Sequence, residues 1–109
     1  MDHQKFESCV EACDDCAAAC DHCATACLKE PNVEMMSRCV LLDRDCASIC
    51  RLASKFMAAE SPFAARLCAL CAEVCEACAA ECEKHEAAHC RDCAKACREC
   101  AKQCRQMAG

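Results

Sequence analysis

Cysteine recurs along this chain at alternating steps of three and four residues, and this spacing limits the possible fold more than any other feature. Nineteen of the 109 residues are cysteine. They form four runs, which are Cys9, Cys13, Cys16, Cys20, Cys23 and Cys27; Cys39, Cys46 and Cys50; Cys68, Cys71, Cys75, Cys78 and Cys82; and Cys90, Cys93, Cys97, Cys100 and Cys104. Residues three and four apart share one face of an α-helix. Each run therefore predicts a helix whose cysteine stripe faces the core.

Breaks between the runs divide the chain into four helices. Pro31, Pro62 and the polar segment 83–86 interrupt the pattern. We expect helices over about residues 3–28, 33–59, 62–84 and 87–107. Twenty-three alanines favour helix, and a single glycine with no Trp or Tyr argues against a β-sandwich or barrel. Short connections make neighbouring helices antiparallel, so the chain is predicted to be all-α: one domain over residues 1–109, an up-down-up-down four-helix bundle with a Cys-lined core.

Composition excludes several kinds of core and partner. Only 14 residues are Leu, Ile, Val or Phe, which is too few for an ordinary aliphatic core. The net charge of −5 provides no basic surface for nucleic acid. The first residues lack the apolar segment of a signal peptide, and no apolar run is long enough to cross a membrane. We therefore expect a cytoplasmic protein without nucleic-acid or membrane partners, in which the cysteines stay reduced.

A core of nineteen reduced thiols indicates a soft metal. One buried cysteine is usually only a small hydrophobe, but nineteen of them would pack loosely unless something else filled the core. Soft thiolates favour Cu(I), Zn(II) and iron-sulfur clusters. A closed zinc site with four thiolates keeps about two negative charges, and stacking several such sites in a dry core is costly. Cu(I) can share two or three thiolates with its neighbours and leaves the core near neutral. The pattern predicts binding of many Cu(I) ions and no enzymatic activity.

Several segments resemble the bacterial copper storage proteins, specifically their cytosolic branch. The resemblance rests on the cysteine ladders, on the stretch from Cys39 to Cys46, on Ser61-Pro62-Phe63, and on the segment 84–90, and it covers nearly the whole chain. It implies a homotetramer of four-helix bundles in which all nineteen cysteines store Cu(I), protecting against copper toxicity and holding copper in reserve. It identifies neither the donor nor the acceptor of the copper.

Antiparallel helices would sort the other residues onto two ends of the bundle. One end, which we name the Phe end, collects Phe6, Phe56, Met57, Phe63, Leu67 and Met107. These apolar side chains predict a plug. The opposite end, which we name the His end, collects Met36, His85 and His89 beside Cys27, Cys82 and Cys90. Imidazole and thioether bind Cu(I) more weakly than thiolate does, which suits a place where ions are accepted and passed inward, so we predict the metal entrance there.

Asp43 occupies a ladder position between Cys39 and Cys46. A carboxylate in a sulfur core is costly unless it is paired or binds metal. One interpretation pairs Asp43 with Arg38, with Arg44 or with a backbone group. The other makes it a metal ligand or a proton acceptor that helps nearby cysteines to ionise.

An apolar stripe flanks the ladders in the middle of the chain. It consists of Leu42, Ile49, Phe56, Leu67, Leu70 and Val74. These residues either pack between the second and third helices or form a subunit interface.

Two alternatives to copper storage remain open at this point. A dithiol/disulfide redox protein would use CxxC pairs, but it needs one exposed pair with a low pKa rather than nineteen thiols that face inward. A zinc or mixed-metal thiolate buffer would bind about four or five Zn(II) at four thiolates per ion.

Overall fold

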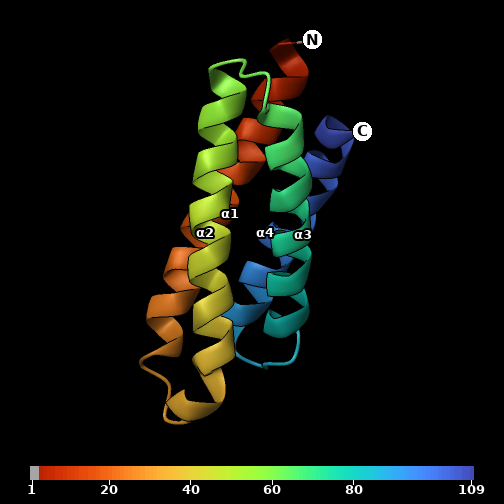
Figure 1. The fold of residues 1–109 in the computed structure, drawn as a ribbon. Helices are drawn as coiled ribbons and strands as arrows, with labels where there is room; N and C mark the ends of the chain where they lie inside the picture. Colours follow the sequence, from red (N-terminus) through yellow and green to blue (C-terminus); the bar gives the residue numbers. More distant parts are fainter. Residues whose placement is uncertain (1–2) are drawn as a thin grey trace.

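Four long helices make up nearly all of the chain (Figure 1). The computed structural model describes residues 3–109, with side chains from Phe6 onward. The elements are α1 (His3–Cys27), a short 3-10 turn η1 (Val33–Met36), α2 (Ser37–Ala58), α3 (Ala64–Cys82) and α4 (Ala88–Ala108). Residues 3–109 contain no strand. The predicted all-α four-helix bundle is confirmed.

The helices form a rod that measures 47 × 17 × 17 Å along its principal axes. Helix α1 packs against α2 and α4, and α3 packs against the same two helices. In Figure 1 the start of α1 and the end of α4 lie at the same end as the α2–α3 loop, which is the Phe end. The α1–α2 and α3–α4 connections lie at the other, which is the His end.

Two helices begin later than the sequence analysis predicts. Helix α2 was expected to begin at residue 33, but residues 33–36 form the tighter η1 turn and the α-helix begins at Ser37. Helix α3 begins at Ala64 rather than at Pro62. The side chain of Ser61 accepts a hydrogen bond of 3.1 Å from the backbone N–H of Phe63, so a turn precedes the first helical residue.

The core consists mainly of sulfur and small side chains. All nineteen cysteines are 0% exposed. Alanines such as Ala53, Ala72 and Ala79 are also buried, and they let the helices approach closely. The largest fully buried side chains are Met36, Met57 and Asp43. Cysteine therefore takes the positions that leucine fills in an ordinary bundle.

The apolar stripe divides into a packed part and an exposed part. The side chains of Leu42, Ile49, Phe56, Leu67 and Val74 pack against the core. That of Leu70 is 48% exposed. Most of the stripe thus serves packing within the bundle, while Leu70 faces outward.

Within the described residues, none of the helices combines the length and the apolar character needed to span a membrane.

Candidate metal centre

The cysteine sulfurs form a network along the bundle axis. All nineteen cysteines are free thiols. Neighbouring Sγ atoms in this network lie 3.5 to 4.0 Å apart, for example 3.8 Å between Cys9 and Cys104 at the Phe end and 3.9 Å between Cys27 and Cys90 at the His end. These distances exceed a disulfide bond of about 2.05 Å but are close enough for one ion to bind two or three sulfurs.

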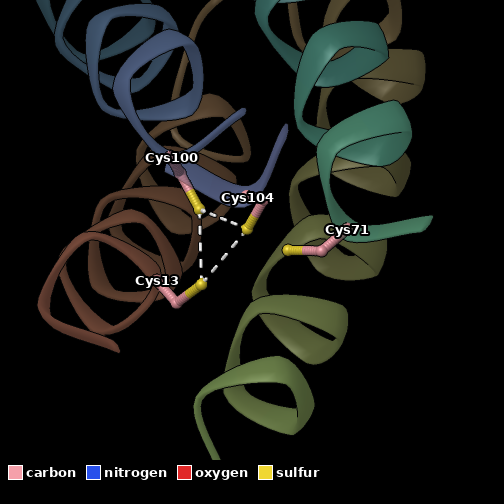
Figure 2. A group of neighbouring side chains, drawn as sticks. All are labelled: Cys13, Cys71, Cys100 and Cys104. Carbon is pink, nitrogen blue, oxygen red and sulfur yellow. Dashed lines mark hydrogen bonds between the residues drawn. The ribbon is translucent and has the colours of Figure 1, made fainter. Parts of the chain in front are cut away.

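The sulfurs gather in groups drawn from different helices. In one group, Cys13 of α1 and Cys100 and Cys104 of α4 form a triangle with sides of 3.6, 3.6 and 4.0 Å (Figure 2). Cys71 of α3 lies beside this triangle, and all four Sγ atoms are within 4.8 Å of one another. Other groups repeat the arrangement along the core, including Cys16, Cys46, Cys50 and Cys75, and Cys20, Cys78, Cys93 and Cys97. The core therefore contains a series of similar thiol groups.

Burial makes the thiolate form unfavourable for two cysteines at the His end. It raises the pKa of Cys27, and it raises the pKa of Cys90 to about 11. Loss of water around a thiolate is the main cause in both residues, since the low-dielectric surroundings favour the neutral thiol. A metal ion that binds these sulfurs must displace their protons.

Asp43 is fully buried at 0% exposure, and thiols from three helices surround it. Its Oδ1 accepts hydrogen bonds from Cys78 at 3.1 Å, Cys93 at 3.3 Å and Cys82 at 3.7 Å. Its Oδ2 accepts one from Cys39 at 3.8 Å. Burial, followed by the nearby Cys93 and Cys78, raises the pKa of this carboxyl to about 10. Asp43 is therefore a neutral acid at neutral pH.

The interpretation that pairs Asp43 with an arginine is wrong. The guanidinium Nε of Arg38 lies 3.3 Å from Glu81, and the Arg44 side chain is exposed. These arginines stand five residues before and one residue after Asp43, so they lie on other faces of α2. The thiols satisfy the carboxyl group instead.

The Phe end is closed by apolar side chains. Phe6 is 3% exposed and Met57 is 1% exposed. Phe56, Leu67 and Met107 are partly buried and pack against the core. Phe63 is 60% exposed, so its predicted place in the plug is wrong. The prediction counted Phe63 in the first turn of the third helix, but α3 begins at Ala64, so Phe63 lies in the loop before it.

His89 directs one ring nitrogen toward the sulfurs at the His end. Its Nδ1 lies 3.5 Å from the Sγ of Cys23, 3.6 Å from that of Cys90 and 4.0 Å from that of Cys27. Its Nε2 lies 2.8 Å from Oε1 of Glu30. Because a carboxylate only accepts hydrogen bonds, Nε2 carries a proton, and in the neutral imidazole the lone pair of Nδ1 faces the thiols.

His85 is held by a buried carboxylate rather than by sulfur. Its Nε2 lies 3.0 Å from Oε2 of Glu81, which is 7% exposed. Glu81 also contacts Arg38 at 3.3 Å and Lys84 at 3.4 Å. His85 and the buried Met36 line an open cavity of 530 Å³ at the His end. The structure thus brings Met36, His85 and His89 to one end, and the ring of His89 lies within 4.0 Å of three thiol sulfurs. Asp43, the fourth predicted entrance residue, lies among thiols deeper in the core.

Sequence reasoning missed both carboxylates at the His end. Glu81 stands four residues before His85 on α3, and this helical spacing could have indicated the contact. Glu30 lies in the α1–α2 loop, where no periodicity relates it to His89. The sequence therefore contained no signal for the Glu30–His89 hydrogen bond.

A family model for copper storage proteins matches residues 2–109. The chain belongs to the copper storage protein family. A curated relative, the uncharacterized cysteine-rich protein YhjQ of Bacillus subtilis (strain 168), is 56% identical over 54 residues, which are 50% of this chain and 50% of that protein. This match thus spans half the length of the curated relative.

Two solved structures of copper storage proteins resemble the whole chain. The Cu(I)-bound copper storage protein BsCsp3 is 55% identical, with a TM-score of 0.92 over 96% of this chain and 99% of that one. A cytosolic copper storage protein from Streptomyces lividans, solved with five coppers, is 36% identical, with a TM-score of 0.94 over 97% of this chain and 93% of that one. The bundle described above is therefore the fold of this family.

Proposed function

We propose that this copper storage protein, one domain over residues 1–109, stores and sequesters many Cu(I) ions per chain on its nineteen core cysteines. The observation that carries the proposal is the network of fully buried, free thiols at spacings of 3.5 to 4.0 Å. The Cu(I)-bound BsCsp3 supports it, as does the Streptomyces lividans protein, which was solved with five coppers and with ten copper equivalents. The role is protection against copper toxicity and a copper reserve in the cytoplasm, without catalytic turnover.

Proton exchange is the chemistry of loading. Copper binds the thiolate form of cysteine, so each Cu(I) that binds releases thiol protons to solvent. The one positive charge of the ion replaces the one proton of a thiol, so the core stays near neutral as it fills. Sulfurs within 4.8 Å of one another in groups of four let each thiolate bridge two ions.

The entrance lies at the His end in this proposal. His89 offers Nδ1 beside three thiols, and the thioether of Met36 and the imidazole of His85 line the adjoining cavity. Asp43 comes next along the core, with thiols of Cys39, Cys78, Cys82 and Cys93 around it. We assign it as an oxygen ligand that binds copper together with these thiols.

Full burial of the thiols argues against the redox alternative. A dithiol switch needs a thiolate that its partner can reach, whereas every cysteine here is 0% exposed. The zinc-buffer alternative requires four thiolates per ion along the core, and the metal titration below tests it.

Assembly into a homotetramer is part of the proposal. Leu41 and Leu52 of α2 are 63% and 43% exposed, and Leu70 of α3 is 48% exposed. Exposed leucines on two adjacent helices are typical of a subunit interface. A symmetric assembly would cover them, and sedimentation analysis of the purified protein would measure its size.

Metal titration of the reduced protein tests the storage function. Cu(I) is added anaerobically in the presence of a competing Cu(I) chelator, and bound copper per chain is counted after gel filtration. We expect tight binding of well over about five ions per chain, because two or three thiolates suffice for each. A matched titration with Zn(II) should saturate near about four or five ions if zinc needs four thiolates each. Tight Zn(II) binding at that capacity with weak Cu(I) binding would contradict copper storage.

A core variant and a surface variant test whether copper binds at the core cysteines. Replacing both Cys13 and Cys104 by serine removes two corners of the triangle in Figure 2 and should lower the copper capacity. The His22→Gln variant changes an exposed side chain and should leave the capacity unchanged.

A further inference from the structure

A second open cavity lies beside the predicted copper entrance. It measures 580 Å³ and is lined by residues of the α3–α4 connection and of α4. Volumes of this order are typical of pockets that bind small molecules. His85 lines both this cavity and the 530 Å³ cavity next to it. A small molecule bound here would therefore lie next to the entrance, outside the thiol core.

Three cationic side chains of α4 line this cavity, although the chain as a whole carries a net charge of −5. They are Arg91, Lys95 and Arg98, which stand four and three residues apart and so share one face of the helix. The carboxylates that line the cavity are those of Glu83 and Glu86. Glu83 neutralises Arg98, with N–O distances of 3.1 and 2.7 Å. Two cations, Arg91 and Lys95, and one carboxylate, Glu86, are thus left to meet a ligand.

The two arginines are held in place by contacts within the chain. Nε and Nη2 of Arg91 donate hydrogen bonds of 3.1 and 2.8 Å to the backbone carbonyl of Glu86, which fix the guanidinium without neutralising its charge. Glu83 fixes Arg98 through two further hydrogen bonds. Ala94, which also lines the cavity, is small and 4% exposed, so it leaves room above the helix. Because groups fixed in advance lose little side-chain entropy on binding, the cavity is preorganised for a charged ligand.

The charges select a class of ligand. Arg91 and Lys95 each favour a carboxylate, and Glu86 favours an ammonium group. A molecule with two carboxylates and one ammonium group matches all three, and this is the charge pattern of a small thiol peptide such as glutathione. Thiolate is also the kind of ligand that Cu(I) prefers. The cavity thus fits a class of small molecule that can carry Cu(I).

We propose, on the basis of the copper storage function proposed above, that this cavity binds a small anionic thiol that carries Cu(I) and presents the ion to the His end. In the transfer, the Cu–S bond to the carrier breaks and a Cu–S bond to a core cysteine forms. The proton of that cysteine passes to the released carrier thiolate. Copper stays Cu(I), so the transfer needs neither an oxidant nor a reductant.

Binding of S-methylglutathione tests the cavity without copper, because its blocked sulfur cannot form a thiolate. Nuclear magnetic resonance spectra of the full-length, reduced apo protein are recorded as the peptide is added. We expect saturable shifts of backbone amides between residues 83 and 98. Lys95→Glu should weaken binding by about 10-fold, since an attractive charged contact becomes a repulsive one. Lys102→Glu makes the same charge change at another exposed position of this face, outside the cavity lining, and should bind the peptide as the wild type does.

Loading from two copper donors tests the role of the cavity in transfer. One donor is the Cu(I)–glutathione complex, and the other is Cu(I) in acetonitrile, whose ligand is neutral. We expect Lys95→Glu to slow loading from the glutathione complex by about 10-fold and to leave loading from the acetonitrile complex unchanged. Lys102→Glu is the matched control and should load at the native rate from both. Ultraviolet absorption of the growing copper–thiolate bonds follows the rate, and copper per chain is counted after gel filtration.

Three results would overturn the donor site. They are amide shifts that lie outside residues 83–98 or do not saturate, equal effects of Lys95→Glu and Lys102→Glu, and slower loading of Lys95→Glu from both donors. The last result would mean that Lys95 acts on the entrance itself and not on the carrier. Copper capacity separates this proposal from storage. A high capacity without peptide binding overturns only the donor site, and a low capacity with saturable peptide binding overturns only storage.

Discussion

The two ends of the bundle are built by the same four helices but differ in chemistry. At the Phe end, the side chains of Phe6 and Met57 are buried in the core. At the His end, imidazoles contact carboxylates on one side, and one of them, His89, contacts thiols on the other. The core near the His end also contains the carboxyl of Asp43, with Cys39 and Cys82 as its neighbours.

This difference shows how a closed metal-binding core can still be filled. Hydrocarbon provides no ligand for an ion that has left water, so a buried Phe and Met close the route at one end. Nitrogen, thioether and carboxylate groups let an ion exchange ligands step by step at the other. We infer that the Phe end contributes mainly to stability and the His end mainly to metal entry.

The largest effect on stability is expected from Met57→Ala at the Phe end. Met57 is 1% exposed, so truncation leaves a cavity that the surrounding helices fill only in part. The free energy of unfolding of the reduced apo protein should fall by about 2–5 kcal/mol, measured by urea denaturation. His89→Ala, at a partly exposed position of the His end, should cost less than about 1 kcal/mol. A larger loss in His89→Ala than in Met57→Ala would reverse the assigned roles.

The next effect concerns the rate of copper entry. His89→Ala removes the nitrogen beside Cys23 and Cys90, and we expect it to slow Cu(I) loading by about 10- to 100-fold. Stopped-flow transfer of Cu(I) from a coloured chelator complex measures the rate, and the final capacity should change by no more than about one ion. Met57→Ala is the matched control and should load at the native rate. Slower loading in Met57→Ala alone would place the entrance at the Phe end.

Most of the fold could be predicted from the sequence because one periodic signal dominates it. Cysteines three and four apart must share a helix face, and short connections leave few ways to arrange four such helices. Burial of residues such as Cys16 and Cys75 follows directly. The separation into a Phe end and a His end also follows, since antiparallel packing sets which helix termini meet.

Contacts outside the periodic pattern could not be predicted in this way. The exposed Phe63 lies in the loop before α3, and Glu30 lies in the loop after α1, so helical spacing says nothing about their neighbours. The partners of Asp43 were missed for another reason. Three of its four thiol contacts come from α3 and α4, and the sequence around Asp43 contains only the arginines that prove to face elsewhere.

Asp43, in the part of the core nearer the His end, should make the free energy of unfolding depend on pH. This effect is smaller than those above. The pKa of Asp43 rises from an ordinary value of 3.8 to about 10 in the folded protein, mainly through burial. Between these two pH values the folded chain keeps a proton that the unfolded chain releases. The unfolded state therefore binds fewer protons, and the free energy of unfolding must fall as the pH rises.

The Asp43→Asn variant isolates this contribution, because asparagine is neutral at every pH and has nearly the same shape. We expect the apo wild type to lose stability relative to Asp43→Asn by up to about 1.4 kcal/mol per pH unit between pH 5 and 8. Urea denaturation under reducing conditions, followed by circular dichroism, measures both proteins. Other groups titrate in both and cancel in the difference. Parallel curves would mean that Asp43 is ionised in the folded core, and the thiols around it would then have to stabilise a full negative charge.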